Sequence, residues 1–169
     1  MKTLIIYVSQ YGTAKAYATK LSKITKIPCI IHESIKDIRN YEQIIYLGSL
    51  YAGGVKGLKN TFRLLKNSNI KAIVDVKKQE NTDNIKASIA KQIEKDILKN
   101  SLIYHLRGGI DYSKLNFKHK TMMKMLYHSL KNKPVESLTQ EDQTLIETYN
   151  KKVDFVDYDA LKQILEVIQ

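Results

Sequence analysis

A chain of 169 residues with 43% apolar side chains is long enough to fold as one domain around a single buried core. No apolar run approaches the roughly 18 to 20 residues that cross a bilayer, which argues against a membrane-spanning protein. Cys29 is the only cysteine, which excludes an intramolecular disulfide and a cysteine-rich zinc site and favours a reducing, cytoplasmic location. The four histidines lack the short spacing of a metal site, so no structural metal is expected.

The formal net charge of +11 biases the chain towards anionic partners. The excess is concentrated in one place: residues 110–134 carry six Lys or Arg against one Asp or Glu, whereas residues 135–169 carry three against eight. Scattered lysines most often only keep a protein in solution, so the total charge names no partner by itself. Because its lysines are clustered, the segment 110–134 is where an anionic partner is expected to bind.

The chain opens on an apolar, β-branched run from Leu4 to Val8, which is typical of a buried strand. Residues 14–24 then place apolar side chains at helical spacing. Where the run meets the helix lies a short turn, Ser9 to Ala14, that carries hydroxyls and a glycine. Because the first N–H groups of a helix have no carbonyl partner and the helix dipole adds positive charge, this turn is predicted to bind a phosphate or a similar anion.

The pattern that follows alternates strands with helices. Strands are expected at residues 29–32, 42–47, 72–76 and 102–106, and helices at 56–66 and 84–98. Strands separated by helices of about 10 to 15 residues indicate right-handed crossovers and a parallel sheet with helices on both faces. We therefore predict an α/β fold with five parallel strands in the doubly wound order 2-1-3-4-5, in which ligands bind beyond the carboxyl ends of the strands.

Three more helices are expected, at residues 116–130, 137–149 and 157–168. The first is amphipathic, with Met122, Met123, Leu126, Tyr127 and Leu130 on one side and Lys120, Lys124, His128 and Lys131 on the other. Thr139 followed by Asp142 is typical of a helix start, as is Asp157 ahead of the last helix.

Three loops thus follow the carboxyl ends of predicted strands, at residues 9–14, 49–54 and 76–81. With this layout the chain resembles the flavodoxin-like family from end to end. The residues that match the family's FMN phosphate loop are Tyr7, Ser9, Gly12 and Ala18. The resemblance implies a single flavodoxin-like FMN-binding domain over residues 1–169, with a basic insert at about 110–134.

One position of the first loop departs from the family. Ala14 stands where members usually carry threonine, so one hydroxyl contact to the phosphate is missing unless Thr13 replaces it. Backbone N–H groups supply much of the anion binding at such a loop. We therefore expect the backbone, Ser9 and Thr13 to hold the phosphate.

The segment Ser49 to Gly54 resembles the family's second flavin loop, in which an aromatic ring stacks on the isoalloxazine and a glycine lets a peptide approach flavin N5. The resemblance makes Tyr51 the stacking residue; the alternative is that Tyr51 only packs the loop and the glycines only form a turn. The FMN-binding residues that the resemblance implies are Ser9, Gln10, Tyr11, Gly12, Thr13, Ala14, Ser49, Leu50, Tyr51, Ala52, Gly53, Val76, Lys77 and Lys78.

The segment from Gly108 to Leu115, with Phe117 and the run Met122 to Met125, resembles most closely the flavodoxin-like protoporphyrinogen oxidases, which insert a basic segment after the fifth strand. This implies an FMN-dependent oxidoreductase that passes electrons from protoporphyrinogen IX through FMN to a quinone or a redox protein. The insert would then meet anionic substrate carboxylates or lipid head groups, as in a cytoplasmic protein with peripheral contact to the inner face of the membrane. The alternative is a helix whose methionines only cover the fold's own core.

The family implies that FMN carries out the redox chemistry while the protein orients it and sets its potential. Lys77 and Lys78 follow the fourth strand, and a cation near flavin N1 stabilises the reduced anion, which predicts an oxidising flavoprotein. No catalytic base is assigned. The polar candidates in the insert are Asp111, Tyr112, His119 and His128, and Arg107 is a candidate for holding a carboxylate, although a structural ion pair is its more frequent role.

Two other functions stay open at this point. One is a basic flavodoxin that carries electrons between protein partners without a small substrate. The other is a module of the same fold that binds nucleic acid or a membrane through its charge. Lysine predominates over arginine and no helix-turn-helix pattern is present, so no nucleic acid is expected.

Overall fold

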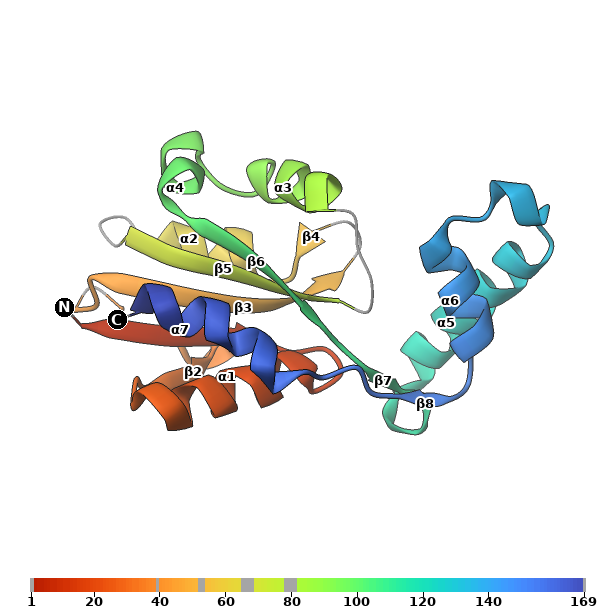
Figure 1. The fold of residues 1–169 in the computed structure, drawn as a ribbon, viewed down its shortest axis with the longest axis horizontal. Coiled ribbons are helices and arrows are strands. Elements are labelled where there is room, and N and C mark those ends of the chain that lie inside the picture. Colours follow the sequence, from red (N-terminus) through yellow and green to blue (C-terminus); the bar gives the residue numbers. More distant parts are fainter. Residues whose placement is uncertain (1, 39, 52–53, 65–68, 78–81, 169) are drawn as a thin grey trace. The chain divides into compact units, whose positions relative to one another are not determined.

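The computed structural model describes residues 2–38, 40–51, 54–64, 69–77 and 82–168, and for 50, 51, 62, 64, 69–77, 82–85 and 141 the description covers the backbone (Figure 1). The chain divides into two compact units. Unit 1 comprises Met1–Gly108 and Val156–Gln169, and unit 2 comprises Gly109–Phe155. Each is described by itself. Unit 2 extends past the basic segment 110–134, because it includes a further helix.

A parallel sheet forms the centre of unit 1. Its strands are β1 (Thr3–Val8), β2 (Cys29–Ile31), β3 (Gln43–Tyr51), β5 (Asn69–Lys77) and β6 (Leu102–Arg107). They lie in the order β2-β1-β3-β5-β6, with every neighbouring pair parallel. The short strand β4 (Gly54–Val55) turns back and pairs antiparallel with the end of β3. The prediction of a parallel sheet in an α/β fold is confirmed.

The sheet is buried on both faces. Alternate residues of β1 point to opposite sides: Leu4, Ile6 and Val8 enter one core cluster, and Ile5 enters the other. The first cluster is closed by α2 (Leu58–Leu64), α3 (Thr82–Ala90) and α4 (Lys95–Asn100), and the second by α1 (Thr13–Thr25) and α7 (Lys162–Ile168). Figure 1 shows these two groups of helices on opposite sides of the sheet.

The prediction of one helix over 84–98 is wrong, because the structure has α3 and α4 with a turn between them. Gln92, in that turn, supplies the physical reason. Its side chain pairs with the backbone of Val55, whose N–H donates to Gln92 Oε1 at 2.9 Å while Gln92 Nε2 donates to Val55 O at 3.2 Å. This long-range pairing satisfies the edge strand β4, which local periodicity does not reveal.

The last predicted helix, over 157–168, also differs at its start. Asp157 accepts a hydrogen bond from Asp159 N at 2.9 Å and so caps a 3-10 turn over Tyr158–Leu161, and α7 follows only at Lys162. The predicted capping role of Asp157 is therefore confirmed, but it opens the tighter turn.

Tyr17 joins three separate parts of unit 1. The ring is fully buried, and its hydroxyl donates to Arg107 O at 2.7 Å and accepts from Asp157 N at 2.8 Å. Arg107 ends β6 and Asp157 follows the return of the chain into unit 1. The Tyr17 side chain is therefore hydrogen-bonded to the backbone near both points where the chain passes from one unit to the other.

Tyr17→Phe is expected to lower the free energy of unfolding by about 2 kcal/mol, because two backbone groups lose this hydroxyl as a partner. Urea denaturation measures the loss. Tyr158→Phe is the matched control, since that ring lies edge-on to Tyr17 at 5.7 Å but is 45% exposed. Equal losses in the two variants would contradict a special role for the Tyr17 hydroxyl.

Unit 2 contains α5 (Phe117–Lys131), α6 (Gln140–Thr148) and a short antiparallel pair of β7 (Ile110–Asp111) with β8 (Lys152–Val153). The 3-10 turn Val135–Ser137 lies between the helices. The capping box of Thr139 and Asp142 is present at the start of α6, as predicted. Hydrogen bonds from Thr139 hold the pKa of the Asp142 carboxyl below its usual range, so this cap is lost as the pH falls through that lowered pKa.

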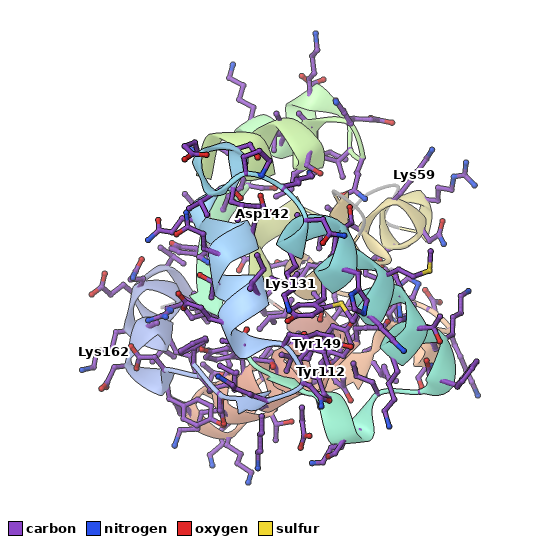
Figure 2. The ribbon with its side chains drawn as sticks, turned by 90° about the vertical axis from the view of Figure 1, so that its right-hand side faces the viewer. Lys59, Tyr112, Lys131, Asp142, Tyr149 and Lys162 are labelled. Carbon is purple, nitrogen blue, oxygen red and sulfur yellow. The ribbon has the colours of Figure 1, made fainter. Side chains whose placement is uncertain are left out.

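Three tyrosine rings form the inner packing of unit 2. Tyr149 stacks on Tyr127 with ring centroids 4.1 Å apart and meets Tyr112 edge-on at 5.4 Å. Figure 2 labels Tyr112 and Tyr149 where they lie together. Leu130, in the same helix as Tyr127, is also buried. Among the described residues, no helix is long and apolar enough to cross a bilayer.

Candidate functional site

The predicted phosphate loop lies at the carboxyl end of β1 and leads directly into α1. Gly12 is the N-cap residue of α1, with φ 89° and ψ −18°, a left-handed conformation that favours glycine. Among the described residues, no side chain caps this helix end, and no heavy atom lies within 4 Å of the place where a Gly12 Cβ would be. A helix N-terminus of this kind presents backbone N–H groups and a positive dipole end, which favour an anion.

Ser9 provides the sharpest sign of a ligand at this loop. Its Oγ is buried and has no hydrogen-bond partner within the part of the chain that the structure describes. A buried hydroxyl left unpaired is costly, and in native proteins such an atom most often serves a ligand or an ordered water. Ser9 lies three residues before Gly12, the N-cap of α1, and the N-terminus of a helix favours an anion.

The first two predicted loops meet at Ser49. The Gln10 N–H donates to Ser49 Oγ at 3.3 Å, and Ser49 is 8% exposed. In the sheet, Val8 pairs with Gly48 and Ser49 pairs with Val76, so the first, second and third loops begin side by side at one edge. The structure therefore brings the beginnings of the three predicted segments together.

Several predicted residues are placed only by their backbone. Leu50 and Tyr51 pair with β4, and Lys77 pairs with Arg107 at the end of β6. Ala52, Gly53 and Lys78 lie outside the described residues, as do the side chains of Leu50, Tyr51, Val76 and Lys77. The stacking role of Tyr51 and the effect of the two lysines on the flavin stay predictions.

Ala14, the position that departs from the family, is fully buried and packs in the same core cluster as Tyr17 and Ala18. Its methyl group is therefore part of the core of unit 1. Tyr11 and Thr13 lie beside Gly12 at the open end of α1. These two residues complete the predicted loop.

Lys56 belongs to the site and was missed from the sequence. Its Nζ donates to Gln10 Oε1, which brings a cation to the first loop. Its backbone is fixed twice: Lys56 N donates to Ser49 O at 3.1 Å, and the buried Tyr46 hydroxyl donates to Lys56 O at 2.6 Å. The predicted helix over 56–66 hid this lysine, because α2 begins only at Leu58 and Lys56 lies in the turn after β4.

A second source of positive charge borders the loop. A cavity of about 360 Å³ begins at Gly12 and runs along α1, and the residues that line it are Gly12, Lys15, Ala16, Thr19, Lys20, Lys23 and Tyr158. Three of them are lysines, so the surroundings of the loop favour an anion. A cavity of about 920 Å³ beside Lys2, Thr3 and Pro28 lies at the amino ends of the strands, the edge opposite the one where ligands of such sheets bind.

The polar candidates of the insert have structural roles in unit 2. Asp111 Oδ1 accepts from both Ser113 N, at 3.0 Å, and Ser113 Oγ, at 2.6 Å, and these bonds hold the pKa of its carboxyl below the usual range. Tyr112 is buried in the aromatic packing. His128 lies edge-on to Tyr127 at 5.4 Å, and His119 donates its backbone N–H to the helix cap Asn116. These contacts identify none of the four residues as a catalytic base.

Cys29 has no reactive character in this setting. Burial raises the pKa of its thiol to about 11, so the thiolate is scarce at neutral pH. Within the described ranges, no three side chains of His, Cys, Asp or Glu gather in a way that would hold a metal ion.

A family model described as a flavodoxin domain matches residues 4–137. The match starts in β1, contains all three loops at the carboxyl edge of the sheet, and ends at the turn that precedes α6. No curated protein matches the chain.

Proposed function

The chain belongs to the flavodoxin domain family, and from this premise we propose that it binds FMN at the loop between β1 and α1 and transfers electrons through it. The observation that carries the proposal is the buried, unpartnered Ser9 Oγ beside the open N-terminus of α1. A phosphate monoester fits this donor set, because it accepts hydrogen bonds from a hydroxyl and from several N–H groups at once. FMN, when bound, supplies the one- and two-electron redox chemistry.

The residues that would hold the cofactor fall into two groups. Ser9, Thr13 and the N–H groups of the first turn of α1 would bind the phosphate, with Lys56 as the nearby cation. Ser49 and the segment that follows it would face the flavin ring, in line with the resemblance of that segment to the second flavin loop. The first group can be tested separately from the second, because riboflavin has the ring and lacks the phosphate.

Lys56→Gln is expected to weaken FMN binding roughly fivefold to tenfold and to leave riboflavin binding unchanged, because the variant removes one charge near the phosphate. Quenching of flavin fluorescence measures both affinities. Lys59→Gln is the matched control, since Lys59 is exposed on α2 and points away from the body of unit 1 (Figure 2). An equal loss for FMN and riboflavin would place Lys56 near the ring instead of the phosphate.

For the substrate, we infer an anionic organic reductant, with protoporphyrinogen IX as the specific candidate and a quinone or a redox protein as the acceptor. Two features support this. The insert resembles that of the protoporphyrinogen-oxidising flavodoxins, and unit 2 holds a cavity of about 400 Å³ that is lined by three lysines, Lys120, Lys151 and Lys152, and one carboxylate, Asp111. Lysines around a small cavity suit a carboxylate-bearing ligand. Lys77, the last residue of β5, and Lys78, the next residue in the sequence, favour a flavin that accepts electrons.

An anaerobic titration of the FMN-loaded protein with protoporphyrinogen IX tests this substrate. Oxidation of the porphyrinogen is expected to bleach the yellow flavin band in proportion to the substrate added. FMN binding without bleaching would reject the substrate and favour the basic electron carrier, whose flavin is reduced by a protein partner. Failure to bind FMN at all would reject the proposed function itself.

A further inference from the structure

The outward side of α5 exposes large apolar side chains. Phe117 is 86% exposed, Met125 68%, Leu126 40% and Met122 37%. At 100° per residue, Met122, Met125 and Leu126 form one stripe along the helix, and Phe117 lies at its first turn. We call these four residues the α5 stripe.

Tyr127 and Leu130, outside the α5 stripe, supply packing of α5 within unit 2. The inward side of the helix is already filled, because Tyr127 stacks on Tyr149 and Leu130 is 4% exposed. The amphipathic pattern predicted from the sequence placed Met122 and Leu126 together with these inward residues. The structure instead separates the apolar residues into a packed side and an exposed side.

The segment that carries the α5 stripe has charges of a single sign. Residues 112–135 contain six lysines and no Asp or Glu, and Lys118, Lys120 and Lys124 are all exposed on α5. A helix that combines exposed apolar residues with cations only is suited to lie in the plane of an anionic membrane surface. A symmetric contact between two copies of this helix would bring the same lysines against each other, which disfavours a second copy as the occupant.

We propose that unit 2 docks on an anionic lipid bilayer, with the α5 stripe inserted among the lipid head groups and the lysines of α5 paired with their phosphates. The helix lies along the surface, since its 15 residues are too few to cross a bilayer. Apolar burial and charge act together here, as stable attachment of a peripheral protein requires two such contributions. The proposal rests on α5 alone and does not depend on flavin binding.

The absence of tryptophan from the chain makes a direct test available. Phe117→Trp introduces a single fluorescent reporter at a strongly exposed position of the α5 stripe. Its emission is expected to shift to shorter wavelength, and to resist quenching by acrylamide, on addition of vesicles of equimolar phosphatidylcholine and phosphatidylglycerol. Ile24→Trp is the matched control, since Ile24 is 48% exposed in unit 1, and its emission is expected to stay unchanged.

The charge requirement is tested by vesicle co-sedimentation. Replacing Lys118 and Lys124 with Gln together is expected to weaken binding to these vesicles at least tenfold, since each lysine near an anionic surface contributes roughly fivefold. Replacing Lys59 and Lys95 with Gln, both exposed in unit 1, is the control of equal charge, with little change expected. Met125→Ser tests the apolar contribution and is expected to weaken binding about tenfold.

Three results would overturn the proposal. The first is an emission of the Phe117→Trp variant that the mixed vesicles leave unchanged. The second is an equal shift with pure phosphatidylcholine, which would show that anionic lipid is not recognised. The third is a short-wavelength emission without vesicles that grows with protein concentration, which would assign the α5 stripe to a second copy. The outcome is independent of FMN loading, so failure here leaves the proposed redox function standing.

Discussion

Ser9→Ala is expected to stabilise the FMN-free protein and to weaken FMN binding, two effects of opposite sign from one hydroxyl. Without ligand, the variant removes a buried oxygen that lacks a partner among the described residues, which is expected to raise the free energy of unfolding by about 1 kcal/mol. With ligand, it removes a hydrogen bond to a charged phosphate, which is expected to weaken binding roughly tenfold to a hundredfold.

Urea denaturation of the FMN-free protein and flavin fluorescence titration measure the two effects of Ser9→Ala. Ser22→Ala is the matched control, because the Ser22 hydroxyl already donates to Ile27 O at 2.6 Å and lies at the far end of α1. That variant is expected to destabilise the protein and to leave FMN affinity unchanged. A Ser9→Ala protein that loses stability and keeps its FMN affinity would show that the hydroxyl serves the fold.

The second large effect is expected at Gly57, which follows Lys56 and precedes α2. Its φ of 75° is left-handed, and a Cβ there would lie 2.8 Å from the Tyr46 hydroxyl and 2.9 Å from Val8 Cγ2. Tyr46 cannot move without giving up its hydrogen bond to Lys56 O, and Val8 is in the core. Gly57→Ala is therefore expected to cost about 3 kcal/mol of stability, from backbone strain and overpacking together.

Gly12→Ala separates these two contributions. Gly12 has a similar φ of 89°, but no described atom lies within 4 Å of the Cβ position. Strain alone predicts a loss of about 1 kcal/mol for this variant. Chemical denaturation of both variants gives the steric contribution at Gly57 as the difference, and equal losses would contradict it.

The parts of this protein that were predictable from sequence are those set by local pattern. The continuous apolar run Leu4 to Val8 indicates a strand, since a strand buried on both faces needs apolar side chains at every position. The glycine-bearing turn that follows indicates a helix N-terminus that favours an anion. Thr139 and Asp142 indicate their capping box because both partners lie within one helical turn. In each case the interacting groups are close in sequence.

The parts that were missed depend on contacts between distant residues. The break between α3 and α4 follows from Gln92 pairing with Val55, 37 residues away. Lys56 reaches Gln10 because β4 folds back on the end of β3. A strand of two residues, such as β4, is too short to give a periodic pattern in the sequence. The division of α5 into a packed and an exposed side depends on where Tyr149 returns to meet Tyr127.

The hydroxyl of Tyr17 has a consequence for how this protein can vary. It binds Arg107 and Asp157, one on each side of the segment that forms unit 2, so the ends of that segment are held near each other by unit 1 itself. Segments whose two ends lie close together are the ones that proteins gain, lose or exchange most readily, because the rest of the fold keeps its own contacts when such a segment changes. Unit 2 can therefore diverge as an accessory of the flavodoxin domain, under selection for its own partner, while the phosphate loop stays under selection for the cofactor.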